Sequence, residues 1–215
     1  MIRCVIFDFD GTVKQSVPIK HDAYYAAVED IPRGVEIFRA IVREFPSMTR
    51  YEGCALFAER AHAMGIECPS GAELAARYTV ACEDAIAECP EVPGAFAFID
   101  WLRHRNIPCF IVSGTPQVPL RETVRRVGLQ GRFEEVFGGP MSKPDHYASI
   151  LKRTGLPPDA VLAIGDGDDD KAAAVAVGAH FVRIEGGAGR PQTGERIVTN
   201  LETIRTLGGM TFAPG

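Results

Sequence analysis

Apolar residues follow two alternating patterns along this chain. Four short apolar runs, each followed closely by Gly, Ser or Asp, have the length and composition of strands covered on both faces. Apolar residues at helical spacing lie between these runs. Strands that alternate with helices predict parallel βαβ units and an α/β fold with a doubly wound parallel sheet. The predicted strands are 2–9, 108–113, 161–166 and 181–184, and the predicted core helices are 117–127, 145–153, 169–177 and one that carries Ala95, Phe98, Ile99 and Leu102.

Residues 15–90 break this alternation, because no strand pattern is convincing there. Proline residues at 32, 46, 69 and 90 separate four segments with helical periodicity. A helical insert directly after the first strand suggests a small α-helical cap domain. The predicted domains are therefore 1–14 plus 91–215 for an α/β catalytic core and 15–90 for the cap. The apolar repeats in the cap are Phe38, Ile41, Val42 and Phe45; Phe57, Ala61 and Met64; and Leu74, Tyr78, Ala81 and Ala85.

Composition narrows the class of protein. With 215 residues, 46% hydrophobic and 24% charged, the chain can form a globular core plus a smaller domain. A net charge of −5 without a basic block argues against nucleic acid as a partner. No apolar stretch reaches membrane-spanning length and no signal-like region precedes the first strand, so we expect a cytoplasmic protein without a membrane partner. None of the six cysteines forms a Cys-x-x-Cys pair, so we expect small buried thiols rather than a zinc site.

The first candidate chemistry is a pair of acids, Asp8 and Asp10, at the end of the first predicted strand. Side chains alternate along a strand, so the two carboxylates can project together while Phe9 turns away. A carboxylate can attack phosphorus to form an aspartyl-phosphate, and a second acid can move the proton. The alternative is structural: Asp10-Gly11 makes a turn and Asp8 caps it.

Two further motifs suit an anionic ligand. Ser113-Gly114-Thr115 ends the second strand, where a hydroxyl, a backbone N–H and the next helix N-terminus can meet an anion. The alternative there is an ordinary helix cap. Lys143 follows a glycine turn and precedes a helix, so it can neutralise phosphate charge and keep a nucleophilic carboxylate ionised. The alternative there is a solvated loop lysine.

The third core strand runs into an acidic segment, Gly165-Asp166-Gly167-Asp168-Asp169-Asp170. Four acids within five positions repel one another without a cation, and carboxylate oxygens near a phosphate suit Mg²⁺. The alternative, that Asp168 or Asp169 caps the following Ala-rich helix, accounts for one or two of these acids.

In their order and placement, these four motifs closely resemble the haloacid dehalogenase superfamily. Its pattern is Asp-x-Asp-Gly-Thr, then a hydrophobic run ending in Ser/Thr-Gly, then Lys, then Gly-Asp-x-x-x-Asp. The resemblance spans the core from the first strand to Ile184 and implies a Rossmann-like core. The insert after the first motif is similar to the subclass with an α-helical cap. Gly167 departs from relatives, which often have Ser or Thr there.

The resemblance implies a role for each motif residue. Asp8 would be the nucleophile and a Mg²⁺ ligand, and Asp10 would be the general acid/base with its backbone carbonyl on the metal. Asp166 would be a further Mg²⁺ ligand. The extra acids leave it open whether Asp169 or Asp170 is the outer ligand, or whether Asp170 instead orients the lysine. The remaining roles are phosphate binding by Ser113 and the Gly114 N–H, and a bridge from phosphate to the nucleophile by Lys143.

Within the superfamily, the acid at position 10 favours a phosphatase, because a phosphate-ester leaving group needs a proton. The expected activity is Mg²⁺-dependent hydrolysis of a small phosphorylated metabolite. A sugar-phosphate mutase is the enzymatic alternative, and a non-catalytic binding or regulatory homologue is the remote one. Neither the substrate nor the oligomeric state is indicated.

Substrate choice is expected to lie in the segment after the first motif, at Lys14, Gln15, Ser16 and Lys20. Lys20 can meet a second anionic group, although a solvent-facing lysine is the simpler interpretation. His146 replaces the second proline of a Lys-Pro-x-Pro pattern seen in relatives. It could contact the surroundings of the substrate phosphate, but it is expected to face solvent in the first turn of its helix. The tail after Leu207 predicts no element and is expected to be loosely held.

Overall fold

A computed structural model describes residues 1–46, 48–186 and 189–214. The chain divides into two compact units, an α/β unit of Met1–Gln15 with Cys89–Gly215 and a helical unit of Ser16–Glu88. The two connecting segments pair with each other, because the Gln15 amide donates to the Pro90 carbonyl at 2.9 Å. The Gln15 side chain also donates to the Glu91 carbonyl at 2.9 Å. The predicted domain limits, 15 and 90, fall inside this pairing, so both residues belong to the α/β unit.

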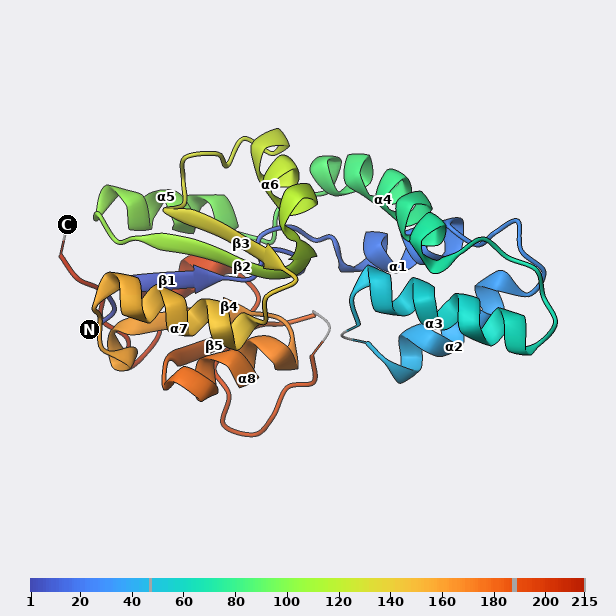
Figure 1. The fold of residues 1–215 in the computed structure, drawn as a ribbon. Coiled ribbons are helices and arrows are strands. Elements are labelled where there is room, and N and C mark those ends of the chain that lie inside the picture. Colours follow the sequence, from blue (N-terminus) through green and yellow to red (C-terminus); the bar gives the residue numbers. More distant parts are fainter. Residues whose placement is uncertain (47, 187–188, 215) are drawn as a thin grey trace. The chain divides into compact units, whose positions relative to one another are not determined.

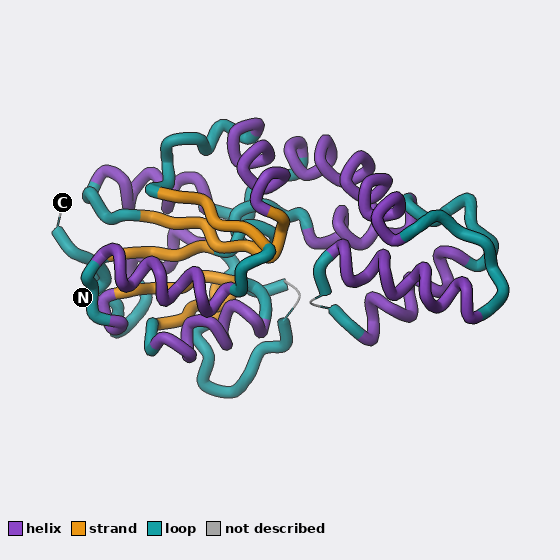
Figure 2. Tube along the Cα trace, in the orientation of Figure 1, coloured by secondary structure: helices purple, strands orange, loops and turns teal. Residues whose placement is uncertain are grey.

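The α/β unit contains one parallel sheet of six strands (Figures 1 and 2), which confirms the predicted fold class. The strand order β3-β2-β1-β4-β5-β6 is that of a doubly wound Rossmann-like sheet. The prediction missed β3 and β6, and it made the first strand too long at both ends. The strands are β1 Cys4–Phe7, β2 Cys109–Pro116, β3 Glu135–Gly139, β4 Val161–Gly165, β5 His180–Ile184 and β6 Ile197–Val198.

Helices cover both faces of this sheet (Figure 1). On one face lie α5 (Ala95–His104) and α6 (Gln117–Arg126), and on the other lie α7 (Lys143–Thr154) and α8 (Asp168–Val177). Two short 3-10 helices complete the unit, η1 (Pro158–Ala160) and η2 (Leu201–Thr206). Strand alternation sends Cys4 and Ile6 into the core cluster beneath α7 and α8, together with Tyr147. Asp8 continues the same parity, which directs it toward the face that carries those helices.

The helical unit consists of the four predicted helices. They are α1 (Val17–Ala26), α2 (Gly34–Glu44), α3 (Arg50–Ala63) and α4 (Gly71–Glu88). Its core is a group of aromatic rings: Phe38 stacks on Tyr24 at a centroid distance of 4.6 Å and on Phe57 at 5.2 Å. Tyr78 of α4 packs on Tyr24 at 4.5 Å.

Several expected apolar positions of the helical unit are exposed instead. Phe45 is 43% exposed because α2 ends at Glu44 and the backbone turns away there. Met64 likewise follows the last residue of α3 and is 45% exposed. The buried stripe of α4 continues in steps of four from Leu74, so the expected Ala81 and Ala85 face outward. Its buried members are Leu74, Tyr78, Cys82 and Ile86.

The C-terminal tail is held more firmly than expected. The Ile2 amide donates to the Thr211 carbonyl at 2.7 Å, and the Ala213 amide donates to the Ile2 carbonyl at 2.9 Å. Phe212 packs edge-on against Trp101 at 5.2 Å. The prediction of a loose tail was wrong because its partners, Ile2 and Trp101 among them, are distant in sequence, and local sequence does not reveal them.

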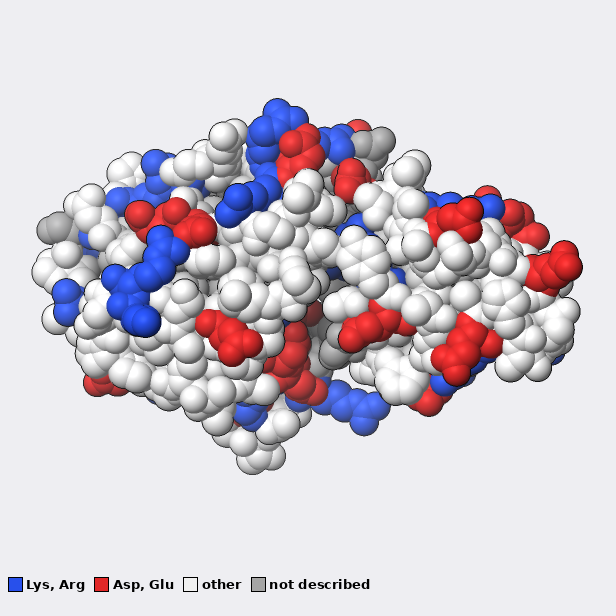
Figure 3. All heavy atoms as spheres, viewed as in Figure 1, with Lys and Arg blue, Asp and Glu red and all other residues white. Residues whose placement is uncertain are grey.

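Surface and thiol features complete the fold. No disulfide bond joins any of the six cysteines, and all but Cys68 are buried, as predicted. Basic and acidic side chains are interspersed over the face drawn in Figure 3. A search of the described residues for a helix with the length and hydropathy of a membrane span finds none.

Candidate active site

Two strand ends bring the acidic motifs together. β1 and β4 are neighbours in the sheet, with Phe7 opposite Ile164 in parallel register. Asp8 and Asp166 come directly after these strands, so they lie side by side at the carboxyl edge of the sheet. β1 and β4 form the switch point of the sheet: β2 and β3 follow outward from β1 on one side, and β5 and β6 follow outward from β4 on the other. Ligands bind at such a switch point in open α/β sheets.

Three buried acids form a compact cluster at this edge. Ligand-capable oxygens of Asp8, Asp166 and Asp170 lie within 4.8 Å of one another. Asp170 lies in the first turn of α8 and accepts a hydrogen bond from the Gly167 amide at 3.0 Å. The last residue of β4 is Gly165, and a Cβ there would overlap the Asp170 carboxyl group. A glycine is therefore required at this position for Asp170 to reach the cluster.

Lys143 joins this cluster from a third element. It is the first residue of α7, which Ser142 caps by accepting a hydrogen bond from the Asp145 amide. Its Nζ lies 3.1 Å from Asp8 Oδ1 and 2.6 Å from Asp170 Oδ1. The side chain is only 11% exposed, which is not the environment of a solvated loop lysine.

Asp169 occupies a different position from Asp170. Its side chain is 47% exposed, and its Oδ2 lies 2.8 Å from Lys143 Nζ. Helical geometry turns consecutive side chains about 100° apart, so only one of the two can face the cluster. Of the two candidates that the sequence left open, the structure places Asp170 with Asp8 and Asp166.

Burial dominates the electrostatics of the cluster. Burial raises the pKa of Asp8 to about 8, against the lowering effect of Lys143 and with repulsion from Asp170 adding to the increase. Burial likewise raises the pKa of Asp170 to about 6, again opposed by Lys143. One ammonium group does not balance three buried carboxylates. This excess of negative charge on oxygen ligands fits a hard divalent cation such as Mg²⁺.

The hydroxyl groups nearby hold the acids in place. Thr115 Oγ1 donates to Asp10 Oδ2 at 2.9 Å, so β2 orients the second acid of the first motif. Thr12 Oγ1 donates to Asp166 Oδ1 at 3.4 Å. Ser113 is buried at the end of β2, and its Oγ accepts the Thr115 amide hydrogen at 3.2 Å. Gly114 is exposed, with open space where a Cβ would stand, so a ligand can approach its backbone.

The expected specificity residues divide between the two units. Lys14 is buried in the α/β unit, where its backbone forms isolated β-bridges with Asp10 and Glu91, and Gln15 is exposed beside it. Ser16 and Lys20 belong to the helical unit, where the Lys20 amide donates to the Ser16 carbonyl in the first turn of α1. The structure therefore brings only Lys14 and Gln15 together with the motif residues in one unit.

The prediction that His146 faces solvent was wrong. It is 5% exposed, its Nε2 lies 3.2 Å from the Gly138 carbonyl oxygen, and its ring packs on Phe137 at 4.9 Å. Both partners belong to β3, which the sequence did not predict. His146 thus fastens the start of α7, and with it Lys143, to the end of β3.

Sequence reasoning assigned no role to Thr12, Thr115 or Arg183. Both threonines lie inside the quoted motifs, and a hydroxyl next to an acid was the available signal. Arg183 is almost completely buried in β5. A charged residue inside an otherwise apolar strand was the signal that it has a specific partner.

A family model for haloacid dehalogenase-like hydrolases matches residues 2–178 of this chain. The chain belongs to this family. The match includes all four motifs and the helical unit, so the predicted membership is confirmed.

Curated relatives of this hydrolase are phosphatases. Phosphoglycolate phosphatase of Pseudomonas fluorescens Pf-5 is 27% identical over 224 residues, which cover 95% of this chain and 78% of the relative. Phosphoglycolate phosphatase of Cereibacter sphaeroides ATCC 17029 is 30% identical over 184 residues, or 82% of each chain. These comparisons support the predicted phosphatase hydrolase within the family.

Solved structures share the fold of the hydrolase. The crystal structure of a predicted phosphoglycolate phosphatase from Haemophilus somnus 129PT matches with a TM-score of 0.77 at 17% identity. The match covers 96% of this chain and 97% of that one. At this identity the likeness concerns the fold alone.

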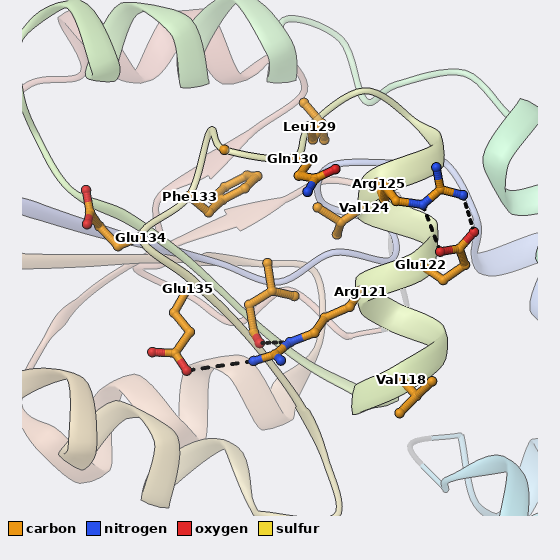
Figure 4. A pocket seen from close by; sticks show the side chains of 12 residues that line it. Val118, Arg121, Glu122, Val124, Arg125, Leu129, Gln130, Phe133, Glu134 and Glu135 are labelled. Carbon is orange, nitrogen blue, oxygen red and sulfur yellow. Dashed lines mark hydrogen bonds and ion pairs between the residues drawn. The ribbon is translucent and has the colours of Figure 1, made fainter.

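A cavity of about 550 Å³ in the hydrolase lies away from the motif residues, between α6 and β3 (Figure 4). Its arginines pair with acids of its own walls, Arg121 with Glu135 at 3.8 Å and Arg125 with Glu122 at 2.5 Å. None of its lining residues is a motif residue. The candidate active site is therefore the cluster of motif residues at the strand ends, not this cavity.

Proposed function

We propose that this hydrolase is a Mg²⁺-dependent phosphatase of a small phosphorylated metabolite, with Asp8 as nucleophile and Asp10 as general acid and base. The observation that carries the proposal is Lys143, whose ammonium group bridges Asp8 and Asp170 at 3.1 and 2.6 Å. This contact supports the proposal, because an ammonium group beside Asp8 could neutralise charge on a transferring phosphoryl group.

In the first step, an Asp8 carboxylate oxygen attacks phosphorus and the bond from phosphorus to the leaving oxygen breaks. Asp10 gives its proton to that oxygen, which leaves as the alcohol, and Asp8 carries the phosphoryl group. In the second step, water gives a proton to Asp10 and attacks the phosphorus. The bond from phosphorus to the Asp8 oxygen then breaks, and Asp8 and inorganic phosphate are released. The Thr115 hydroxyl holds the Asp10 carboxyl group through both steps. Ser113 and the Gly114 N–H bind the phosphoryl oxygens.

The carboxylates of Asp8 and Asp166 and the backbone carbonyl of Asp10 would hold Mg²⁺, and Asp170, whose carboxylate belongs to the same cluster, would be an outer partner or a further ligand. When bound, the ion offsets repulsion between the anionic nucleophile and the anionic substrate. Asp169 is kept apart from this set of metal ligands in the proposal, because its side chain is half-exposed and pairs with Lys143.

The helical unit is proposed to act as the cap that selects the substrate, with Lys14, Gln15, Ser16 and Lys20 on the segment that enters it. Phosphoglycolate is the first substrate to test, because the curated relatives carry that name. A cytoplasmic location belongs to the same proposal and can be tested by cell fractionation.

The test is phosphate release from phosphoglycolate and from a panel of small phosphate esters, with Mg²⁺ and with EDTA. We expect turnover that requires Mg²⁺ and that falls at least about a thousand-fold in Asp8→Asn. Asp10→Asn is expected to retain Mg²⁺ binding while losing turnover. Asp159→Asn alters an exposed acid of η1 and serves as the control with unchanged turnover.

Full turnover in a folded Asp8→Asn variant would contradict the proposal. The mutase alternative makes a different prediction for the same panel: isomerisation of a sugar phosphate that depends on a sugar bisphosphate, with little free phosphate. A chain that binds Mg²⁺ but converts no member of the panel would favour a non-catalytic homologue.

A further inference from the structure

Arg183 is the most deeply buried arginine side chain among the described residues, with 1% exposure in β5. Its guanidinium group makes four hydrogen bonds. Nη1 donates to the Asp166 carbonyl oxygen at 2.8 Å, and Nη2 donates to Asp168 Oδ1 at 2.9 Å. The remaining two bonds go to Glu195, from Nε at 2.7 Å and from Nη2 at 3.2 Å. Arg183 therefore links the turn between β4 and α8 to the segment before β6.

Burying a guanidinium group is costly unless its hydrogen bonds are satisfied, and an aliphatic side chain would fill a strand position without that cost. The partners of Arg183 are also unusual. One is the backbone of Asp166, a proposed metal ligand, and another is the first residue of α8, the helix that supplies Asp170. The contacts thus concentrate on the turn that carries the acid cluster.

A second group braces the same turn. The Gly189 amide donates to the Asp166 carbonyl oxygen at 2.9 Å, so this oxygen accepts two hydrogen bonds. A Cβ at Gly189 would overlap Arg183 Nη1 and lie 2.6 Å from the Asp166 oxygen. Glu195 is itself fixed, by Lys171 Nζ at 2.7 Å and by the Gln192 amide at 3.0 Å.

We propose that Arg183 is a positioning residue for the metal site. It holds the Asp166 peptide and the start of α8 so that the Asp166 and Asp170 carboxylates stay within reach of one cation. Outer partners of metal ligands commonly change metal affinity by about 10- to 100-fold when they are removed. This inference rests on the proposed Mg²⁺ site.

The test measures how Mg²⁺ shifts the thermal unfolding midpoint of the whole chain, and from this the Mg²⁺ concentration that gives half the maximal shift. We expect that concentration to rise at least about 10-fold in Arg183→Met. Arg183→Lys retains one charged donor and is expected to lie between Arg183→Met and the unchanged chain. Turnover at saturating Mg²⁺ is expected to recover in both variants. Arg132→Met removes another ion-paired arginine of the same unit, 2.6 Å from Asp100, and is expected to change nothing in the titration.

Gly189→Ala provides an independent disturbance, because it keeps every charge but forces Arg183 and the Asp166 carbonyl apart. It decides the question if Arg183→Met does not fold. An unchanged Mg²⁺ titration in folded Arg183→Met, or in Gly189→Ala if the former is unfolded, would overturn the positioning role. An unmodified chain that shows no Mg²⁺ response would instead overturn the proposed metal site.

Discussion

The two units of this protein bury different kinds of side chain. The core of the helical unit is a set of contacting aromatic rings, and its buried arginine, Arg50, lies over the Tyr78 ring at 4.7 Å. The core cluster of the α/β unit beneath α7 and α8 is mostly aliphatic, and charged side chains are buried at the carboxyl edge of its sheet. The charged groups concerned are Asp8, Asp10, Asp166, Asp170, Lys143 and Arg183.

The two kinds of buried side chain have opposite effects on the stability of the fold. Aromatic burial stabilises a fold in proportion to the area removed from water. Like charges in a buried cluster oppose folding unless a cation offsets them. The helical unit therefore has a core whose packing favours its own folding, whereas the carboxyl edge of the α/β sheet holds groups that a bound cation would stabilise.

The largest expected effect on stability comes from removing the centre of the aromatic core of the helical unit. Phe38→Ala is expected to destabilise the helical unit by about 3–5 kcal/mol, because Phe38 is fully buried between two rings. Helicity is expected to be lost at a lower denaturant concentration than in the unchanged chain. Fluorescence of the single tryptophan, Trp101 in α5, reports the unfolding of the α/β unit separately. Phe45→Ala, at an exposed position, is the control and should change stability by less than about 1 kcal/mol. Equal losses from the two variants would contradict the aromatic core.

A change of pH tests the opposite unit. Between about pH 4 and their raised pKa values, about 8 for Asp8 and about 6 for Asp170, these two groups bind more protons in the folded chain than in the unfolded chain. Without metal, their contribution to the free energy of unfolding should therefore fall as pH rises through this window, by up to about 1.4 kcal/mol per pH unit for each proton. At the proposed site Mg²⁺ would replace these protons, so its stabilising effect should increase with pH.

The measurement is the Mg²⁺-dependent shift of the unfolding midpoint, compared on the acidic and alkaline sides of this window. Asp8→Asn removes the group with the higher pKa and should flatten the dependence. A Mg²⁺ shift that is the same on both sides would show that the buried carboxylates do not compete with protons for the cation.

The smallest expected effect concerns polar groups of the helical unit. Thr49 and Glu52 form a capping box at the start of α3: the Thr49 amide donates to Glu52 at 2.8 Å, and the Glu52 amide donates to Thr49 Oγ1 at 3.3 Å. Thr49→Ala should cost about 0.5–1 kcal/mol by chemical denaturation, while Thr49→Ser retains the cap and most of the stability. A loss as large as that from Phe38→Ala would mean that polar contacts, rather than rings, stabilise this unit.

Much of the α/β fold could be predicted because its signals are local. The strands β1, β2 and β4 have continuous apolar runs, and β5 has an apolar run interrupted by Arg183. The topology rule for parallel sheets brings the carboxyl ends of these strands to one edge. By contrast, β3 is an edge strand whose residues are mostly half-buried, and β6 has two residues. β3, with Glu135 and two glycines in its five residues, is not apolar enough to stand out from a loop, and β6 is not long enough.

The residues that support the site were harder to predict, because their partners are distant in sequence. The environment of His146 depends on β3, and the role of Arg183 depends on a carbonyl group 17 positions earlier. Periodicity places a side chain on a face of its own element, but it does not show which other element covers that face.

The missing side chain of Gly165 makes the acid cluster depend on a residue that carries no chemistry of its own. A chain with alanine at this position would retain every carboxylate, the lysine and all spacings of the motif. Its Asp170 carboxyl group would nevertheless have to move. A motif search that reads only the charged letters would accept such a chain, so a useful signature for this site includes the small residue beside the acids.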